Sequence, residues 1–219
     1  MKIKLSFSFL LLVLMSMTGI KAYAHDFEVA NVDGKTLYYI YNSDGMTVSV
    51  SYRGSSSGAY SDEYSGDIVI PELVTYNGSY TVTGIGDDAF SGCSGLTSVT
   101  IPNSVTRIGE RAFQSCSDLT SVTIPNSVTS FGIGAFSYCS GLTSIKVESG
   151  NTKYDSRDNC NAIIETSTNI LLFGCQNTII PNSVTRIDSY AFSGCSGLTS
   201  ITIPNSVTSI DSYAFRYCI

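Results

Sequence analysis

One histidine, a few close pairs of aspartates and seven cysteines are the residues of this sequence that could do chemistry. His25 is the single histidine, and it is expected to become the first residue of the mature chain, where order is rarely kept. Ser-His-Asp and Cys-His nucleophile systems both need a positioned histidine. The sequence therefore argues against these two classes of enzyme.

Paired carboxylates can act as general acid and base without a histidine. The pairs Asp87 with Asp88 and Asp155 with Asp158 would have to do this work. Each pair lies in a stretch rich in Ser, Asn and Gly, where aspartate commonly accepts hydrogen bonds from turn N–H groups. We therefore favour a turn role over catalysis, and we predict no catalytic residue and no enzyme activity.

The segment Asp155-Ser156-Arg157-Asp158-Asn159 gathers oxygen ligands of the kind that calcium prefers. The spacing of an EF-hand is absent, and so is the glycine-aspartate nonapeptide of calcium-binding solenoids. Arg157 adds a positive charge that weakens a cation site. A solvated loop is the favoured interpretation, so no metal and no cofactor are predicted.

Five cysteines recur at a fixed spacing, and they lie at positions 93, 116, 139, 195 and 218. Neither a CxxC spacing nor partner histidines accompany them, which disfavours a metal site. We interpret them as buried, packed thiols rather than disulfides or metal ligands.

The cysteines keep step with an Ala-Phe pair whose phenylalanines lie 23 residues apart, at 90, 113 and 136 and again at 192 and 215. A fixed period of this length is the mark of a solenoid and lies within the leucine-rich-repeat range. A single coil cannot bury its own apolar face, so neighbouring coils must stack on it. If the fold is a solenoid, Phe90, Phe113 and Phe136 form one continuous column.

One unit can be read residue by residue. Leu96, Val99 and Ile101 alternate with Ser98 and Thr100, which predicts a short strand with one buried face. Proline, asparagine and serine at 102–104 turn the chain. On the return path the predicted inward groups are Val105, Ile108, Ala112, Phe113 and Cys116, and residues 110–115 are expected to form a helical turn.

The outward strand positions of successive units would form a ladder of short polar side chains. The candidate binding residues of this ladder are Ser98, Thr100, Ser121, Thr123, Ser144, Lys146, Ser200 and Thr202. Interface hot spots favour Trp, Tyr and Arg, so such a face predicts weak or avidity-dependent contact. A second set on the outer face and edges is either better suited to binding or simply packed, and comprises Tyr138, Tyr154, Tyr190, Tyr213, Arg107 and Arg186.

Two segments depart from the period. Residues 25–69 hold alternating, tyrosine-rich runs and are predicted to form an N-terminal β cap, followed by a solenoid over 70–219. Residues 148–179 form an irregular insert with a predicted hairpin, in which a turn at Ser167 and Thr168 would pair Ile164 with Leu171 and Ala162 with Phe173. The same register sets Cys160 opposite Cys175, and either a disulfide or two buried thiols would satisfy it.

The first residues predict export. Lys2 and Lys4 precede an apolar run over 5–17, and Ala22-Tyr23-Ala24 ends it, as in a signal peptide cleaved after Ala24. The mature chain has nine basic and eighteen acidic residues, a net charge of −9, which disfavours nucleic acid as a partner. The sequence has no later stretch of about 20 apolar residues, so we predict no transmembrane segment after the signal peptide.

The repeating unit Ile-Pro-Asn-Ser-Val-Thr-x-Ile-x-x-x-Ala-Phe-x-x-Cys-x-x-Leu-Thr-Ser-Val-Thr resembles the BspA-type leucine-rich repeats over residues 70–219. The resemblance implies a leucine-rich-repeat solenoid, α/β in class but mostly β with short helical turns. It also implies a surface or secreted protein of anaerobic gut or oral bacteria, and some family members are adhesins for host matrix proteins. The family supplies no general catalytic residues and no defined binding motif to transfer.

Two functions are therefore expected. The first is a secreted or cell-surface protein that binds a macromolecule of a host or neighbouring cell, in the manner of an adhesin. The alternative is a structural or truncated paralogue without a specific ligand. Since the chain stops at Ile219 where a further unit would continue, an open last coil would drive self-association in that case.

Overall fold

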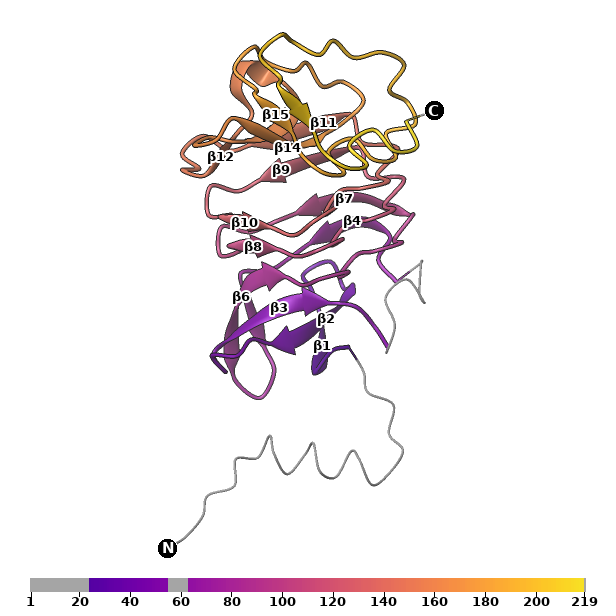
Figure 1. Ribbon diagram of the computed structural model, residues 1–219. Helices are drawn as coiled ribbons and strands as arrows, with labels where there is room; N and C mark the ends of the chain where they lie inside the picture. The colour runs from indigo at the N-terminus through magenta and orange to yellow at the C-terminus, as the bar shows by residue number, and fades with distance from the viewer. Residues whose placement is uncertain (1–23, 55–62, 219) are drawn as a thin grey trace, which may run out of the picture.

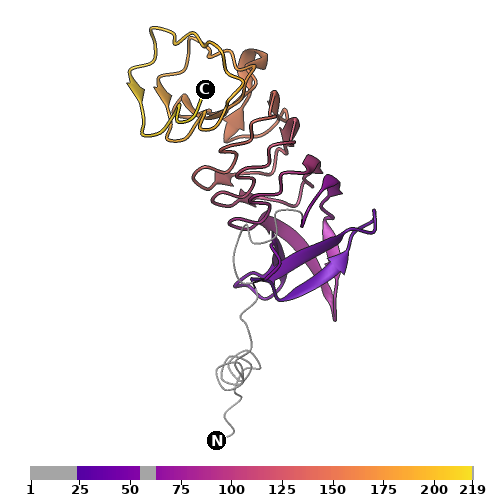
Figure 2. The same cartoon turned by 90° about the vertical axis from the view of Figure 1, so that its right-hand side faces the viewer.

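The computed structural model describes residues 24–54 and 63–218, and these form a stack of coils that begins on a small N-terminal sheet (Figures 1 and 2). The predicted signal peptide lies outside the described residues except for Ala24. Within the described ranges no helix has the length and apolar character needed to cross a bilayer. Strands make up nearly all the regular structure, which agrees with a mostly β solenoid.

The N-terminal sheet is antiparallel and passes directly into the solenoid. Strands β1 (Phe27–Ala30), β2 (Thr36–Tyr41) and β3 (Thr47–Ser51) pair in antiparallel order. β3 then pairs in parallel with β6 (Ser79–Ile85), which also carries the short antiparallel β5 (Leu73–Thr75). Parallel pairing continues to β8 (Arg107–Ile108) and β10 (Ser130–Phe131). The residues predicted as a cap thus supply a hydrogen-bonded first layer, although the division at residue 69 stays a prediction.

A second column of parallel strands runs beside the first. It comprises β4 (Gly66–Val69), β7 (Leu96–Thr100), β9 (Ser121–Ile124) and β11 (Ser144–Val147). β4 pairs with β7, and β9 pairs with β11. Leu96, Val99 and Ile101 are buried while Thr100 is exposed, so the predicted alternation is confirmed.

The repeated phenylalanines form the predicted column. The ring centroids of Phe90 and Phe113 lie 5.0 Å apart and those of Phe113 and Phe136 lie 5.2 Å apart, in nearly parallel planes. Tyr64 begins the column with its centroid 4.7 Å from that of Phe90. The Tyr64 hydroxyl donates to the Ser51 carbonyl oxygen and accepts from the Tyr38 N–H. The N-terminal sheet is therefore anchored to the first coil by a buried tyrosine.

The expected helical turn over residues 110–115 is wrong, because this stretch is a run of tight turns. Gln114 N–H donates to the Arg111 carbonyl, whereas Phe113 N–H donates to Ala135 in the next coil at 2.8 Å. Arg111 and Ser115 have φ values of 50° and 62°, which a right-handed helix excludes. Alternate N–H groups are thus committed to the neighbouring coil rather than to an i−4 carbonyl.

The recurring cysteines are explained by a contact between coils. The thiol of Cys116 donates to the Phe90 carbonyl oxygen at 3.1 Å, and Cys139 donates to Phe113 at 3.0 Å. The thiol of Cys218 makes the same contact to Phe192. Burial raises the pKa of Cys139 to about 12, so its thiol stays protonated and unreactive at neutral pH.

The irregular insert consists of β12 (Tyr154–Asp155), the 3-10 turn η1 (Arg157–Asn159), β13 (Ala162–Glu165) and β14 (Ile170–Gly174). The predicted hairpin forms, and Ile164 faces Leu171 as expected. A bulge after Ile163 shifts the register by one residue, so Ala162 faces Gly174 instead of Phe173. The pairing predicted from a symmetric turn is therefore wrong beyond the bulge.

The bulge also separates the two cysteines of the insert. Both Cys160 and Cys175 are buried free thiols in the structure. Cys175 belongs to the apolar cluster of Phe173 and the coils before it, whereas Cys160 belongs to the cluster of Phe192 and the coil after it. The disulfide between Cys160 and Cys175 stays a prediction, which thiol titration tests.

β14 enters the stack as a partial extra layer. The Phe173 ring meets Phe136 edge to face at 5.5 Å, and Gly174 N–H donates to the Ala191 carbonyl of the following coil. We call the side of the stack formed by the tight turns around the repeated phenylalanines the turn edge. There the coils are in direct contact, since the Tyr138 N–H donates to the Ser193 carbonyl at 2.8 Å. β14 continues in parallel to β15 (Arg186–Ile187) and β16 (Ser209–Ile210). Figure 2 shows the last coil tilted against the coils below it.

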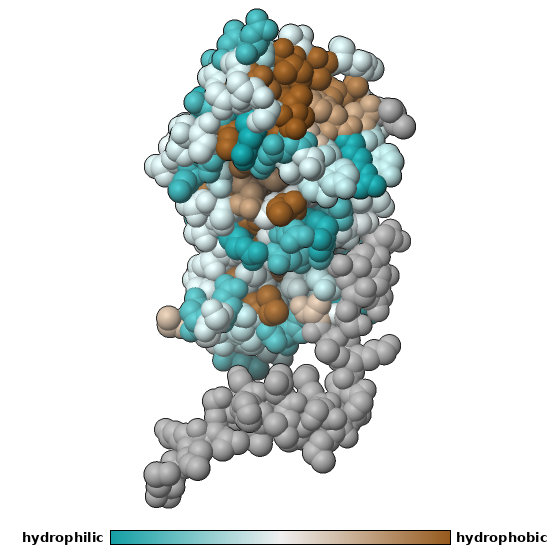
Figure 3. Space-filling model, viewed as in Figure 1, coloured by the Kyte–Doolittle hydropathy of each residue, from teal (hydrophilic) through white to brown (hydrophobic). Residues whose placement is uncertain are grey.

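The last described coil is less covered than the others. Its inward side chains are partly exposed, and they include Leu198, Ile201, Val207 and Phe215, with Ile210 49% exposed. Figure 3 shows a patch of apolar surface at this end of the stack.

Gly174 tests the role of β14 as a wedge. A methyl group at this position would overlap the Phe192 ring, because the strand lies directly against it. We expect Gly174→Ala to destabilise the fold by about 1–3 kcal/mol through overpacking. The measurement is chemical unfolding, with Gly95→Ala as control, because a Cβ there would meet only Ser65 at an ordinary 3.4 Å. Equal stability of the two variants would contradict this packing.

Thiol titration tests the cysteines. In the native protein at pH 8 we expect Cys218 to be alkylated first, because it is only partly buried while the other six are buried. In guanidinium chloride without reductant all seven should react. A count of five would mean that two cysteines are joined in a disulfide, and peptide mapping would identify them.

Candidate binding surface

The outward positions of β7, β9 and β11 form one polar face. In β9 and β11, Ser121 lies beside Ser144 and Thr123 beside Lys146. Ser98 and Thr100 occupy the same positions in β7, next to β4. Asp67 of β4 accepts hydrogen bonds from the Ser98 and Thr97 hydroxyls, and these lower its pKa. The six residues share a surface as predicted, while their role in binding stays a prediction.

Ser200 and Thr202 do not continue this ladder. Residues 201–204 form no strand, and among the described residues β11 pairs only with β9. Ser200 and Thr202 instead line a separate hollow of about 350 Å³, together with residues 178–180 at the end of the insert and just after it. The ladder predicted over four coils therefore spans three, because the insert takes the place of the next strand.

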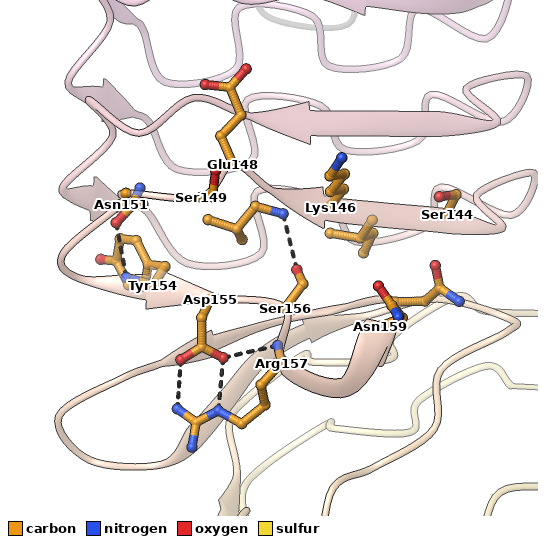
Figure 4. A pocket seen from close by; sticks show the side chains of 14 residues that line it. Ser144, Lys146, Glu148, Ser149, Asn151, Tyr154, Asp155, Ser156, Arg157 and Asn159 are labelled. Atoms are coloured by element: carbon orange, nitrogen blue, oxygen red, sulfur yellow. Dashed lines mark hydrogen bonds and ion pairs between the residues drawn. The ribbon is translucent and has the colours of Figure 1, made fainter.

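A cleft of about 740 Å³ opens where that next strand is missing. Figure 4 shows Ser144 and Lys146 of β11 on one wall and Asp155, Ser156 and Arg157 on the other. The remaining polar lining comes from Glu148, Ser149, Asn151, Tyr154, Asn159 and Asn161. The cleft thus joins the outward side chains of β11 to hydroxyl, amide and charged groups of the insert.

Two side chains fix the far wall of the cleft. The Ser156 hydroxyl accepts from the Val147 N–H at 3.0 Å and donates to the Ala162 carbonyl at 2.7 Å, so it joins β11 to β13. The Asn151 amide donates to the carbonyls of Pro125 and Val128 in the preceding coil. Its oxygen accepts the N–H groups of residues 153 and 154, which saturates the side chain.

Arg157 ties the insert together and joins it to the following coil. Its guanidinium forms a two-pronged ion pair with Asp155 at 2.7 and 2.6 Å and donates to Asn169 and Ser183. Burial alone would raise the pKa of Asp155, but the hydrogen bonds from Arg157 and Thr166 outweigh burial and lower it. This carboxylate is engaged in structure, as are Asp87 with Arg107 and Asp88 with Arg111.

The tyrosines and arginines predicted on the outer face and edges have different roles in the structure. Tyr154 is buried, with its hydroxyl donating to the Thr129 carbonyl, so it belongs to the packing. Arg107 pairs with Asp87, and Arg186 lies 3.5 Å from both Asp188 and Asp211. Tyr138, Tyr190 and Tyr213 lie on the turn edge with Tyr217 and Arg216, which the sequence analysis missed. The signal for these two was their position, two and one residues after the repeated phenylalanine.

Arg157→Gln tests the ion pair. We expect a loss of about 1–2 kcal/mol in unfolding free energy, because the bond to Asp155 is charge-assisted and partly buried. The control Arg107→Gln removes a pair whose side chains are both 54% exposed, and it should cost about 0–1 kcal/mol. Equal losses for the two variants would contradict the structural role of Arg157.

The same pair predicts a pH dependence. The folded pKa of Asp155 is lowered, so its stabilising effect is present above its unfolded pKa of about 3.9 and disappears as the pH falls through the folded value. The stability difference between wild type and Arg157→Gln should therefore shrink below about pH 4, as measured by thermal unfolding from pH 7 downwards. A constant difference across this range would contradict the assignment.

Comparison with known proteins gives the same picture of the repeats. The sequence matches the family described as the BspA type leucine rich repeat region in six copies, over residues 47–170 and 172–219. No curated protein matches.

Several solved structures are similar, and three of them illustrate the likeness. A leucine-rich cell surface protein from Faecalibacterium prausnitzii is 24% identical, with 84% of this chain and 73% of that chain covered and a TM-score of 0.44. The pneumococcal vaccine antigen PcpA is 16% identical, with 90% of this chain and 69% of that chain covered and a TM-score of 0.47. A leucine-rich repeat protein from Bacteroides ovatus is 24% identical, with 85% of this chain and 56% of that chain covered and a TM-score of 0.42. Since the repeat match covers most of its length, the chain belongs to the BspA-type leucine-rich repeat family.

Proposed function

We propose that this protein is exported and acts at the cell surface or beyond it, where it binds a macromolecule of a host or neighbouring cell. The single observation that carries the proposal is the cleft beside β11. Support comes from the predicted signal peptide and from a repeat family whose members are typically surface or secreted proteins. The mature net charge of −9 directs the proposal away from nucleic acid and towards a neutral or basic ligand surface.

The lining of the cleft favours a polar ligand. The outward Val147 N–H of β11 is already bound to the Ser156 hydroxyl, so recognition falls to the side chains of β11 and to the hydroxyl, amide and charged groups of the insert. Ser144 and Lys146 then supply side-chain contacts on one wall, and Asn159 on the facing wall. The Ser and Thr residues of β7 and β9 extend this contact surface along the stack.

Lys146 gives the sharpest test. It is exposed on β11 and has no hydrogen-bond or ion-pair partner among the described residues, so reversing its charge leaves the fold intact. We expect Lys146→Glu to weaken binding about tenfold or more, measured with residues 25–219 against immobilised extracellular matrix and cell-surface proteins. Lys153→Glu is the matched control, because it changes the charge equally from a residue outside the cleft.

Two results would count against the proposal. One is a folded wild-type protein that binds nothing across the panel. The other is equal binding by Lys146→Glu and wild type, which would move the contact away from the cleft.

A further inference from the structure

Each coil turns through two positions with positive φ, one two residues before the stacked phenylalanine and one two residues after it. Their φ values lie between 50° and 79°. The earlier position holds Asp88, Arg111, Gly134, Tyr190 and Tyr213, and the later one holds Gly92, Ser115, Tyr138, Gly194 and Tyr217. Left-handed backbone suits glycine and is costly for a bulky residue. The four tyrosines are therefore placed against backbone preference, which points to a use for their rings.

The rings lie together on the turn edge of the last coils. Tyr190 stacks on Tyr213 at 5.2 Å, and the Arg216 guanidinium lies 5.1 Å from the Tyr213 centroid and 4.8 Å from that of Tyr217. Tyr217 in turn lies 5.9 Å from Tyr138. We call these five side chains the tyrosine strip. Tyr213 and Tyr217 are 54% and 53% exposed, so the strip presents aromatic faces to solvent.

Gly194 lets Tyr138 and Tyr217 of the strip meet across a coil. Tyr138 and Tyr217 occupy the later position in the coils on either side of it. A Cβ on Gly194 would lie 2.5 Å from the Tyr138 Cα and 2.7 Å from a ring atom. The missing side chain thus makes room for the contact between the two tyrosines.

A hollow lies at each end of the strip. One, of about 450 Å³, is lined by Tyr138, Tyr217, Gly194 and the hydroxyls of Ser140 and Ser196. The other, of about 110 Å³, is bordered by Tyr190 and by Ser137. The Ser137 hydroxyl is buried, with the residue 2% exposed, and it has no hydrogen-bond partner among the described residues. A buried hydroxyl that lacks a partner and borders a hollow can donate a hydrogen bond to a polar ligand group and accept one from it.

We propose that the tyrosine strip binds an oligosaccharide. A sugar ring has a C–H face that packs on an aromatic ring and a rim of hydroxyls that bond to groups such as Ser140, Ser196 and the tyrosine hydroxyls. The larger hollow falls within the size range of small-ligand sites, about 300–1,000 Å³. Five side chains are few for a protein interface, which commonly takes about 20–30 residues a side.

Arg216 adds a preference within this class. Its guanidinium lies against two rings and donates one N–H to the Tyr217 hydroxyl at 3.2 Å, while the residue stays exposed, and an exposed guanidinium favours a sugar that carries a carboxylate. The strip lies on the turn edge and shares no residue with the cleft beside β11, so this inference does not depend on the cleft.

Substitution by glycine separates binding from folding. Because Tyr213 and Tyr217 adopt left-handed backbone, Tyr213→Gly and Tyr217→Gly should leave the melting temperature unchanged or raise it by a few degrees. We expect each to weaken the binding of neutral and uronic-acid oligosaccharides of four to six units by about tenfold or more, measured by calorimetry on residues 25–219. Ser115→Gly is the matched control, at the later position of a coil without tyrosine, and should keep wild-type affinity.

Each other outcome overturns the inference. The first is that the folded wild type binds no oligosaccharide. The second is that Tyr213→Gly and Tyr217→Gly both keep wild-type affinity for it. The third is that the variants lose affinity only for a polypeptide ligand, which would make the strip a protein contact. Lys146→Glu in the same titration should keep wild-type affinity. An equal loss there would place the sugar in the cleft instead, and would leave the proposed function standing without the strip.

Discussion

The structure depends on one constraint, which is that each inward side chain must meet the same side chain of the next coil. The phenylalanine rings show it most directly, with centroids 5.0 and 5.2 Å apart and planes within a few degrees of parallel. A stack this close tolerates no drift, so the period is held at 23 residues, and Cys116, Cys139 and Cys218 each meet the carbonyl of the preceding stacked phenylalanine. Repetition in the sequence is the consequence of this contact.

Those parts of the fold that follow from the constraint could be predicted, and those set by local backbone geometry could not. The column of Phe90, Phe113 and Phe136, the strand alternation around Val99 and the hairpin of the insert all follow from spacing and apolar pattern. A bulge after Ile163 carries no clear sequence signal, and it moved Cys160 and Cys175 into separate clusters. The turn over residues 110–115 looks helical in composition, but hydrogen bonds to the next coil decide its conformation.

The candidate surfaces were predicted less well for the same reason. Ser98 to Lys146 follow from the strand alternation, whereas the loss of Ser200 and Thr202 from the ladder depends on where β14 enters the stack. The turn positions with positive φ illustrate a further limit. The coil imposes a left-handed backbone at these positions whatever residue occupies them. Glycine at 134 and 194 adopts this backbone without strain, whereas tyrosine at 190, 213 and 217 adopts it at an energetic cost.

A regular repeat also limits what a solenoid can recognise. Equivalent coils present the same serine and threonine at each step of about 4.8 Å, so a ligand that contacts only the ladder binds equally well in several registers. Specific recognition needs a place where the translation is broken. The insert is such a place, because it ends the series of parallel strands at β11 and sets Lys146 opposite the ion pair of Asp155 and Arg157. The tyrosine strip is another, since Gly194 interrupts the column between Tyr138 and Tyr217. In this protein the exact repeats build the support, and the departures from them supply the surfaces that can tell one ligand position from the next.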